Sequence, residues 1–485
     1  IMEYLMGKDN FGISSKYDGD LAYRIVVVRY AMLGNRFARY KEVKIATDVS
    51  DKTVAYVNEH MDTLSGISVN EDMIRKYNYS EYFSSIIGYT GPISESEYTA
   101  LHKKNKDYTQ NDTVGKAGLE QYYETYLRGK NGEQKFYIDN VGRISEIISS
   151  TDSVAGDDLY LSIDADLQKA TYLALQNEIA AIVYSNIKSG EIPINDVYTA
   201  LIGNSVINTE HFSKAKASDT EKNVLSVFKS RQKTTLGKIK QELTSSPEAL
   251  NTMSDEVLDE FTYIISMLKD DQVLLKNEID TSDSVYQKWK NQKISPKEYL
   301  SYCITQHWID ISQLNVDEKY ADSTEVYDAL CKYILKNIKT DTEFSKIIYQ
   351  YMITRGEISP RQLCLILFDQ GVLDYDDATV NKLKNGSLSP RDFLMKKIYN
   401  IEITPAQLAL EPCTGSCVVT DEKTGEIRAM VSYPGYDSNK LANGVDSEYF
   451  ASLQHDKSSP LLNYATQQKT APGSTFKLVS ATAGL

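Results

Sequence analysis

The chain has 485 residues, of which 41% are hydrophobic, and it carries a formal net charge of −14 at pH 7. This length suggests about three domains, and the apolar content is sufficient for a packed core. The negative charge argues against nucleic acid as a partner. No run of residues is long and apolar enough to span a membrane.

The region up to residue 150 predicts a mixture of helices and short strands. We expect mixed helix over 1–45, including a basic amphipathic stretch over 20–40, and a helix through His60 that Asp48 or Ser50 caps. Alternation and glycine turns predict strands at 66–69 and 84–91, and a helix with a glycine stop at 122–129.

The next elements along the chain are interrupted by a long insertion. Residues 156–164 alternate as a strand, and 166–182 read as an apolar-periodic helix. A hairpin follows only much later, with strands at 415–420 and 426–432 and a turn at 421–425.

Residues 184–411, between these elements, have the pattern of a helical bundle. A helix-start signal recurs, with an apolar residue, Ser or Thr at the N-cap, Pro at the first position and an acid or amide two positions later. It occurs at 294–299, 358–363, 388–393 and 403–408, with a looser copy at 188–193. The unequal spacing argues against a regular solenoid. The insertion either binds a partner or serves as a spacer or brace, and the pattern does not choose.

The cysteines and histidines do not indicate a metal or cofactor site. The cysteines are Cys303, Cys331, Cys364, Cys413 and Cys417. An odd, sparse set is not a disulfide framework. Cys413 and Cys417 have the spacing of one metal half-site, but no second Cys/His pair accompanies them. We expect unpaired thiols or one optional bridge, no metal and no cofactor.

The end of the chain has the strongest chemical signal. Pro472-Gly473 predicts a turn, Ser474 a helix N-cap, and the following residues a buried helix of small and apolar residues. A helix places Ser474 and Lys477 on one face. A serine hydroxyl needs an adjacent base to act as a nucleophile. A lysine serves as that base only if its pKa falls from ~10.4 toward ~7–8, which costs about 4 kcal/mol and needs a dry or cationic surround.

The spacing of this pair is weak evidence by itself. The same Ser-x-x-Lys occurs at 185/188, 213/216, 226/229, 230/233 and 266/269, in polar helical sequence. The alternative to a nucleophile is a simple helix cap. The surrounding residues favour the nucleophile, because Pro-Leu-Leu-Asn-Tyr-Ala-Thr (460–466) followed by Pro-Gly-Ser-Thr-Phe-Lys (472–477) resembles the active-site segment of the penicillin-binding proteins.

Other segments resemble class B members of the same family. GYTG (88–91), VGKAGLE (114–120), YYETYLRG (122–129) and GR (142–143) resemble the pedestal, or dimerisation, domain. The strand and helix at 156–182 and the later hairpin resemble the transpeptidase domain. Two residues depart from the family pattern. Ala117 stands where a serine is usual, and Tyr464 where an arginine is usual.

The resemblance implies an α+β multidomain fold. Its parts are a mixed α/β pedestal domain at 1–150, the start of the transpeptidase domain at 151–183, an all-helical insertion at 184–411 and the rest of the transpeptidase domain at 412–485. It also implies a peptidoglycan D,D-transpeptidase, in which Ser474 attacks the bond between the terminal D-alanines of a stem peptide and Lys477 takes its proton. The Ser474 N–H would be one donor to the oxyanion, and β-lactams would be trapped at the same serine. The other implied partners are cell-wall synthesis proteins, bound through the pedestal or the insertion.

Two family motifs, Ser-x-Asn and Lys-Thr-Gly, are not recognised after Ser474. Lys423-Thr-Gly425 precedes the nucleophile and has the pattern of an ordinary hairpin turn, and Ser68-Val-Asn70 lies in the proposed pedestal. We therefore expect a chain truncated before both motifs and inactive alone. The resemblance places the protein outside the cytoplasmic membrane, with its N-terminal anchor absent from this chain.

Two alternatives stay open. The chain could be a non-catalytic scaffold whose pedestal and insertion bind other wall-building proteins. It could also be a β-lactam sensor or a β-lactamase, although the large pedestal argues against this.

Overall fold

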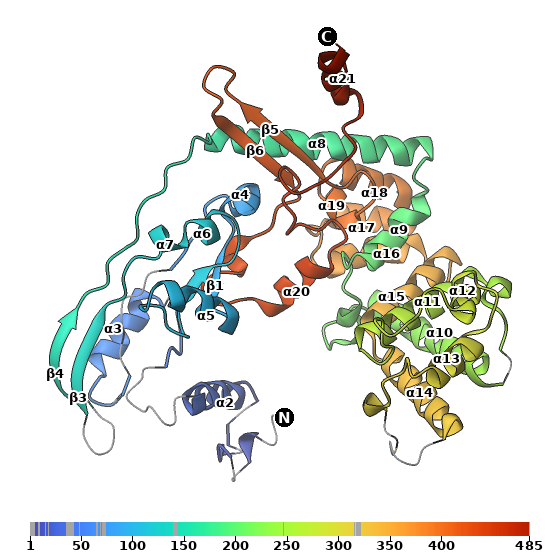
Figure 1. The fold of residues 1–485 in the computed structure, drawn as a ribbon, viewed down its shortest axis with the longest axis horizontal. Coiled ribbons are helices and arrows are strands. Elements are labelled where there is room, and N and C mark those ends of the chain that lie inside the picture. The colour runs from blue at the N-terminus through green and yellow to red at the C-terminus, as the bar shows by residue number, and fades with distance from the viewer. Residues whose placement is uncertain are drawn as a thin grey trace. The chain divides into compact units, whose positions relative to one another are not determined.

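A computed structural model of the chain is drawn in Figure 1. It describes all residues except 1–4, 8, 9, 15, 18, 35–42, 48, 65, 68, 70–73, 139–143, 246, 315, 317–321 and 485. The chain folds into two compact units. Unit 1 comprises Ile1–Ser80, Ile86–Leu161 and Asp437–Asp446, and unit 2 comprises Glu81–Ser85, Ser162–Tyr436 and Ser447–Leu485. Every helix within the described residues is too short or too polar to cross a lipid bilayer.

Unit 1 is a mixed α/β body with short strands. Its elements are α2 (Gly19–Gly34), α3 (Asp51–Glu59), β1 (Thr90–Pro92), α5 (Glu95–Lys104), β2 (Thr113–Gly115), α6 (Gly118–Tyr122), α7 (Glu124–Leu127), β3 (Glu133–Ile138), β4 (Ile144–Thr151) and η4 (Ser438–Lys440). β1 pairs antiparallel with β2, and β3 with β4. The residues of α4 (Ser80–Ile87) are divided between the two units.

Two buried carboxylates organise the interior of unit 1. Glu120 accepts a hydrogen bond from the Tyr77 hydroxyl (3.2 Å) and forms an ion pair with Arg75 (3.0 Å). Glu124 accepts from the Tyr108 hydroxyl (3.2 Å) and from the Gly115 N–H (2.7 Å). Burial raises the pKa of the Glu124 carboxyl. Each carboxylate is satisfied by several donors, as a buried charge requires.

Several predictions for unit 1 were confirmed and others were wrong. Helices α2 and α3 form as expected, and the Ser50 side chain caps α3 through the Thr53 N–H (3.3 Å). The strand predicted over 84–91 is wrong in its first half. Residues 84–87 end α4, because Phe83, Ile86 and Ile87 recur at helical spacing, and β1 starts only at Thr90.

The helix predicted over 122–129 is also incorrect as a single element. Two short helices, α6 and α7, are separated there at Tyr123. No strand forms at Gly66, Ile67 or Val69. Three predicted features lie outside the described residues, namely the Asp48 cap, the GR pair at 142–143 and Ser68 of the predicted strand.

Unit 2 is built on one long helix. Its elements outside the helical insertion are α8 (Ala165–Ser189), β5 (Gly415–Thr420), β6 (Ile427–Tyr433), α20 (Ser447–His455), η5 (Gly473–Phe476) and α21 (Lys477–Gly484). The helix predicted at 166–182 is α8, which continues for two further turns to the left-handed cap Gly190. Figure 1 shows α8 running along the antiparallel β5–β6 hairpin, which matches the predicted hairpin. The strand predicted at 156–164 is wrong, because these residues form no strand. They contact β6 through two hydrogen bonds, which the Ser162 hydroxyl and the Asp164 N–H donate to its carbonyls.

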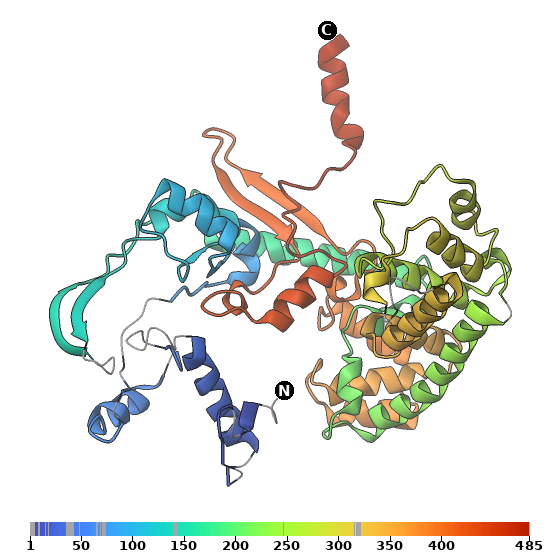
Figure 2. The same cartoon turned by 60° about the horizontal axis from the view of Figure 1, so that its bottom comes forward.

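The insertion is helical, as predicted. It contains α9 (Ile194–Gly203), η1 (Thr209–Ser213), α10 (Asp219–Thr244), η2 (Leu250–Thr252), α11 (Asp255–Asp270), α12 (Ser284–Lys290), α13 (Pro296–Thr305), η3 (Ile311–Gln313), α14 (Ser323–Ile338), α15 (Thr342–Thr354), α16 (Pro360–Asp369), α17 (Asp377–Asn385), α18 (Pro390–Tyr399) and α19 (Pro405–Leu408). Figure 2 shows these helices packed against one another, and they share one apolar core that includes Leu201, Phe261 and Leu363. The α+β multidomain fold with a helical insertion is thus confirmed, while the boundaries at 150, 183 and 411 stay predictions.

The same helix junction recurs through the insertion. In seven junctions among the described residues, a residue with positive φ stands three positions before the next N-cap. These residues are Gly190, Ser205, Gln292, His307, Gly356, Gly386 and Ile401, and the N-caps are Pro193, Asn208, Ser295, Asp310, Ser359, Ser389 and Thr404. A left-handed residue ends one helix and an N-cap begins the next one, so a fixed short turn connects successive helices.

The predicted caps are present. Ser295, Ser359 and Thr404 each form a complete capping box with the residue three positions later, and the Ser389 hydroxyl accepts from the Asp392 N–H (3.0 Å). The looser copy before α9 has no side-chain cap, since Pro193 occupies the N-cap position.

We expect Ser295→Ala to lower the free energy of unfolding by about 1 kcal/mol, because it removes the acceptor for the Glu298 N–H. Ser301→Ala, on the same helix, is the control and is expected to change stability by less than about 0.5 kcal/mol. Urea unfolding followed by tryptophan fluorescence measures both variants, since both tryptophans, Trp289 and Trp308, pack in the insertion. Equal destabilisation by the two variants would contradict the capping role.

Candidate active site

The N-terminal half of α8 holds the β5–β6 hairpin through a buried amide. The Gln168 side chain is fully buried. Its Oε1 accepts from the Met430 N–H (2.8 Å), and its Nε2 donates to the Met430 carbonyl (3.0 Å) and to the Tyr82 carbonyl (2.8 Å). The amide therefore takes the place of a strand partner along the outer edge of β6 and fixes the hairpin on the helix.

One turn further along α8, Tyr172 joins the hairpin to residues of α4. Its hydroxyl donates to the Glu81 carboxylate (3.1 Å) and accepts from the Gly435 N–H (3.2 Å). Burial beside that carboxylate raises the pKa of Tyr172 far above its usual value. A Cβ at Gly435 would lie 1.8 Å from the Glu81 carbonyl oxygen, so only glycine fits where the chain leaves β6.

The segment that leads toward Ser474 is attached to β6 and α4. Ser432 is buried, and its hydroxyl accepts from the Tyr464 N–H (2.9 Å) and donates to the Leu462 carbonyl (3.3 Å). The Asn463 side chain donates to the Ser85 carbonyl (3.0 Å). The Tyr464 hydroxyl donates to the Ser458 carbonyl (2.7 Å), so this tyrosine closes a local turn at the position where the family usually has arginine.

Ser474 and Lys477 lie one turn apart, at the start of the last helix. Ser474 is in the 3₁₀ turn η5, and the Lys477 N–H donates to the Ser474 carbonyl. The N-cap prediction for Ser474 was wrong, because the turn begins at Gly473 and its N-cap is Pro472, two residues before Ser474, without a side-chain cap. Among the described residues, no hydrogen bond joins the Ser474 hydroxyl to the Lys477 amine.

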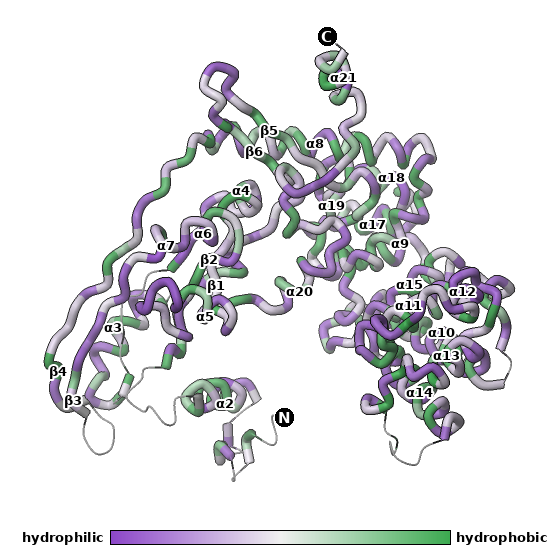
Figure 3. The backbone as a smooth tube through the Cα atoms, in the orientation of Figure 1, coloured by the Kyte–Doolittle hydropathy of each residue, from purple (hydrophilic) through white to green (hydrophobic). Residues whose placement is uncertain are grey.

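The prediction that this helix is buried was also wrong. Every described residue from Gly473 to Gly484 is exposed, and Leu478 has 76% of its surface in solvent. Figure 3 shows the apolar residues of α21 in green. No described element packs on this apolar face, which explains the exposure. As described, the pair therefore has the spacing of a nucleophile and its base but not the dry environment that the base needs.

The Lys423-Thr-Gly425 sequence is a hairpin turn, as expected. The Asp421 carboxylate accepts from the N–H groups of Lys423 (2.8 Å) and Thr424 (2.9 Å), and Gly425 has a φ of +76°. These hydrogen bonds lower the pKa of Asp421. The carboxylate is therefore used to stabilise the turn, which connects β5 to β6. The Ser-x-Asn sequence in the proposed pedestal, Ser68-Val-Asn70, begins and ends on residues that lie outside the described ones.

Other polar groups with possible chemistry already have structural roles. All five cysteines are free thiols, and the described residues contain no group of three or more His, Cys, Asp and Glu side chains able to hold a metal ion.

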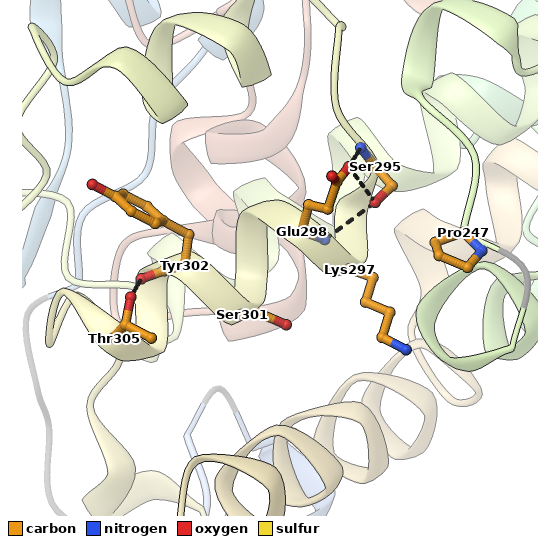
Figure 4. Close-up of a pocket in the computed structure, with 7 residues that line it drawn as sticks. All are labelled: Pro247, Ser295, Lys297, Glu298, Ser301, Tyr302 and Thr305. Atoms are coloured by element: carbon orange, nitrogen blue, oxygen red, sulfur yellow. Dashed lines mark hydrogen bonds between the residues drawn. The ribbon is translucent and has the colours of Figure 1, made fainter.

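A surface pocket of about 600 Å³ on α13 is shown in Figure 4. Its Ser295 and Glu298 form the capping box, and its Lys297 amine donates to the Thr244 carbonyl (2.7 Å). No nucleophile–base pair forms there.

Sequence reasoning missed the residues that position this segment, namely Gln168, Tyr172, Ser432 and Asn463. A usable signal existed for two of them. Gln168, Tyr172 and Gln176 recur every four residues on the apolar face of α8, and polar residues on a buried face need partners. Ser432 and Asn463 had no such signal, because their hydrogen bonds depend on the tertiary path of the chain.

The comparison with known families is decisive at this point. Residues 8–161 match the model of the penicillin-binding protein dimerisation domain, and residues 415–485 match that of the penicillin-binding protein transpeptidase domain. The chain belongs to the class B penicillin-binding proteins. The resemblance noted from the sequence is thereby confirmed, with the transpeptidase match covering β5, β6, Ser474 and Lys477.

Curated relatives of this penicillin-binding protein agree. It is 29% identical over 157 residues to the peptidoglycan D,D-transpeptidase MrdA of Salmonella typhimurium, covering 32% of this chain and 25% of the relative. It is 35% identical over 136 residues to penicillin-binding protein 2A of Bacillus subtilis, covering 28% of this chain and 19% of the relative. The chain thus spans a quarter or less of the length of these relatives. A solved structure of penicillin-binding protein 2B from Streptococcus pneumoniae is 23% identical, covers 37% of this chain and 28% of its own, and has a TM-score of 0.23.

Proposed function

We propose that this chain carries the acylating serine of a peptidoglycan D,D-transpeptidase, with Ser474 as the nucleophile and Lys477 as its base. The observation that carries the proposal is the transpeptidase-domain match over 415–485, which includes both residues one helical turn apart. The relatives' names supply the reaction class, and the proposal extends that class to this chain.

In the proposed reaction, the Ser474 hydroxyl oxygen attacks the carbonyl carbon between the two terminal D-alanines of a stem peptide. The Lys477 amine takes the hydroxyl proton, and the Ser474 N–H donates to the developing oxyanion. The C–N bond breaks, and the leaving D-alanine takes a proton from the Lys477 ammonium. An amine of a neighbouring stem peptide then attacks the ester, cross-links the two stems and restores the serine. A β-lactam acylates the same oxygen by opening its ring.

The exposure of α21 limits what the chain does by itself. The apolar side chains Phe476, Leu478 and Val479 are in solvent, so the Lys477 amine lacks a desolvating surround. We propose that the 485-residue chain is inactive alone, and that the pair becomes reactive when other protein surface covers α21. The proposed setting is the outer face of the cytoplasmic membrane, with an N-terminal anchor, where peptidoglycan stem peptides and other wall-synthesis proteins are available.

The test is labelling with a fluorescent penicillin, applied to the 485-residue chain and to the complete product of its gene. We expect stoichiometric labelling of the complete product and none of the 485-residue chain. Ser474→Ala is expected to abolish labelling, and Lys477→Ala to slow it by about 10²–10⁴-fold. Ser480→Ala is the matched control, because Ser480 lies on the same exposed helix and donates to the Phe476 carbonyl (3.3 Å).

A label that persists in the Ser474→Ala variant would overturn the assignment of the nucleophile. The second candidate function is a non-catalytic scaffold, which the exposed serine and the large helical insertion favour. It predicts no labelling of the complete product, while the product still binds other wall-synthesis proteins. A label that is released rapidly by hydrolysis would instead indicate a β-lactamase.

A further inference from the structure

A shallow groove lies where the C-terminal half of α8 meets α18. It has a volume of about 390 Å³, and its lining is Tyr184, Lys188, Arg391, Asp392, Met395, Lys396 and Tyr399. Figure 1 shows the two helices close together in unit 2. None of the lining residues belongs to the Ser474 region, and among them only Asp392 takes part in a helix cap, that of α18. The fold therefore leaves the groove without an assigned role.

Three cations line this groove, and their charges are poorly compensated. Within the described residues, the Lys188 and Lys396 amines have no hydrogen-bond partner and no carboxylate at ion-pair distance, and both side chains are exposed. The nearest recorded counter-charge of Lys396 is the Glu402 carboxylate, which is itself paired with Lys397. Arg391 has only a 3.4 Å hydrogen bond to the Ile187 carbonyl and a 3.9 Å pairing with Asp392. The Asp392 carboxylate accepts from the Ser389 hydroxyl (2.7 Å), within the cap of α18. In a chain with a net charge of −14, this is a local surplus of positive charge.

The cations stand beside two aromatic rings. The rings of Tyr184 and Tyr399 are 5.2 Å apart between centroids and inclined by 59°. Tyr184 packs against the core of the insertion, which fixes its ring. Tyr399 keeps 61% of its surface in solvent and covers little of the protein itself. The exposed face of the Tyr399 ring, positioned by the Tyr184 ring, can therefore stack against a flat apolar surface of a ligand.

We propose that this groove binds an acidic saccharide, whose pyranose ring stacks on Tyr399 while its carboxylate or phosphate meets Lys188, Arg391 and Lys396. A guanidinium and two amines match the oxygens of such an acid group, and charge-assisted hydrogen bonds are about twice as strong as neutral ones. The apolar face of a sugar ring needs an aromatic platform, which the cations alone do not supply. A neutral saccharide and a simple inorganic anion each satisfy only half of this site.

The site is separate from the proposed nucleophile and does not depend on it. The groove lies near the end of α8, 20 residues beyond Gln168, which holds the hairpin. At 1.5 Å per residue this is about 30 Å along the helix. Binding here would hold a sugar polymer at a distance from the hairpin, with α8 as the rigid connection. Saccharide binding in the groove is therefore independent of whether Ser474 is a nucleophile.

The experiment titrates the 485-residue chain with three saccharides and with inorganic phosphate, and it measures binding by calorimetry and, for the saccharides, by saturation-transfer NMR. The probes are the disaccharide N-acetylglucosamine–N-acetylmuramic acid, which carries a carboxylate, N-acetylglucosamine 1-phosphate, which carries a phosphate, and neutral diacetylchitobiose. We expect at least one acidic probe to bind at least tenfold more tightly than diacetylchitobiose, and its binding to weaken with added salt. The acidic probe that binds more tightly identifies the acid group.

Matched variants locate the binding. We expect Tyr399→Ala and Lys396→Gln each to weaken binding at least tenfold. Their controls are Tyr375→Ala, which removes a tyrosine of 63% exposure outside the groove, and Lys384→Gln, which removes an exposed lysine of α17. Both controls are expected to bind as the unmodified chain does. Circular dichroism checks that every variant is folded, which we expect because all four side chains are exposed.

Four results would overturn the proposal. One is the absence of binding by both acidic probes, and another is equal binding of diacetylchitobiose. The third is equal weakening by a groove variant and its control. The fourth is binding of inorganic phosphate as tight as that of the sugar phosphate, because it would show that stacking of the sugar ring on Tyr399 adds no affinity.

Discussion

Replacing Glu256 by alanine is expected to lower the free energy of unfolding of the insertion by about 3–5 kcal/mol. The Glu256 side chain is 3% exposed. The Arg231 Nη2 atom donates to both of its oxygens (2.8 Å each), and Arg355 pairs with one of them (2.6 Å). Without the carboxylate, Arg231 remains largely buried, and its one remaining ion-pair partner among the described residues is Glu357, at 3.7 Å. An uncompensated buried charge is the main cause of the expected loss.

The measurement is urea unfolding at pH 6 followed by tryptophan fluorescence. Glu278→Ala, at an exposed position, is the control and is expected to change stability by less than about 0.5 kcal/mol. Combining Glu256→Leu with Arg231→Met removes both charges and is expected to recover much of the loss. A loss below about 1 kcal/mol for Glu256→Ala, or no recovery in the double variant, would contradict the role of the buried charge.

The second large effect on stability is a dependence on pH, which we expect from Glu260, one turn further along α11. Glu260 is 1% exposed, and its Oε1 has no hydrogen-bond partner among the described residues. Burial, with the charge of the neighbouring Glu256, raises the pKa of Glu260 from 4.5 to about 8. Asp259 also raises this pKa, while Lys238 and Arg231 lower it. The carboxyl is therefore protonated in the folded protein at neutral pH.

The raised pKa of Glu260 makes the insertion less stable as pH rises. A pKa that is higher in the folded than in the unfolded state means that folding takes up a proton. The stabilisation is complete below about pH 4.5 and is lost progressively up to about pH 8. Because a tenfold change in proton affinity corresponds to about 1.4 kcal/mol, we expect a loss on the order of 3 kcal/mol between pH 5 and pH 8.

Glu260→Gln tests this expectation, because an amide resembles the protonated acid and does not titrate. We expect the variant to be more stable than the parent at pH 8, by an amount that shrinks toward pH 5. Glu278→Gln is the control with an exposed carboxylate, and it should reproduce the pH profile of the parent. Parallel profiles of the parent and Glu260→Gln, from thermal unfolding across this range, would show that Glu260 does not cause the loss.

The starts of the insertion helices were predictable from the sequence, whereas their ends were only partly so. Ser295, Ser359 and Thr404 form the expected capping boxes because such a box involves residues three positions apart. Two of the helix ends have glycine, Gly356 and Gly386, at the left-handed position, where this residue type is common. Ser205, Gln292, His307 and Ile401 adopt the same left-handed conformation without being glycine, so packing of the next helix imposes it.

Predictions failed where the outcome depended on a distant partner. Residues 84–87 and 156–164 alternate like strands, but the first segment joins α4 and the second has no strand beside it. At the candidate site the spacing of Ser474 and Lys477 follows from the local turn and was predictable. The exposure of α21 was not predictable, since an apolar helix is buried only where other protein surface covers it.

The continuity of α8 also limits how the insertion can be engineered. Tyr172 and Ile179 lie in the core against β6, whereas Val183 and Ile187 lie in the core of the insertion. The two cores thus share one uninterrupted backbone. Cutting out residues 190–411 would leave Val183 and Ile187 as a bare apolar end on a helix that the hairpin still needs. A shortened version would therefore be prone to aggregation unless those positions were made polar at the same time.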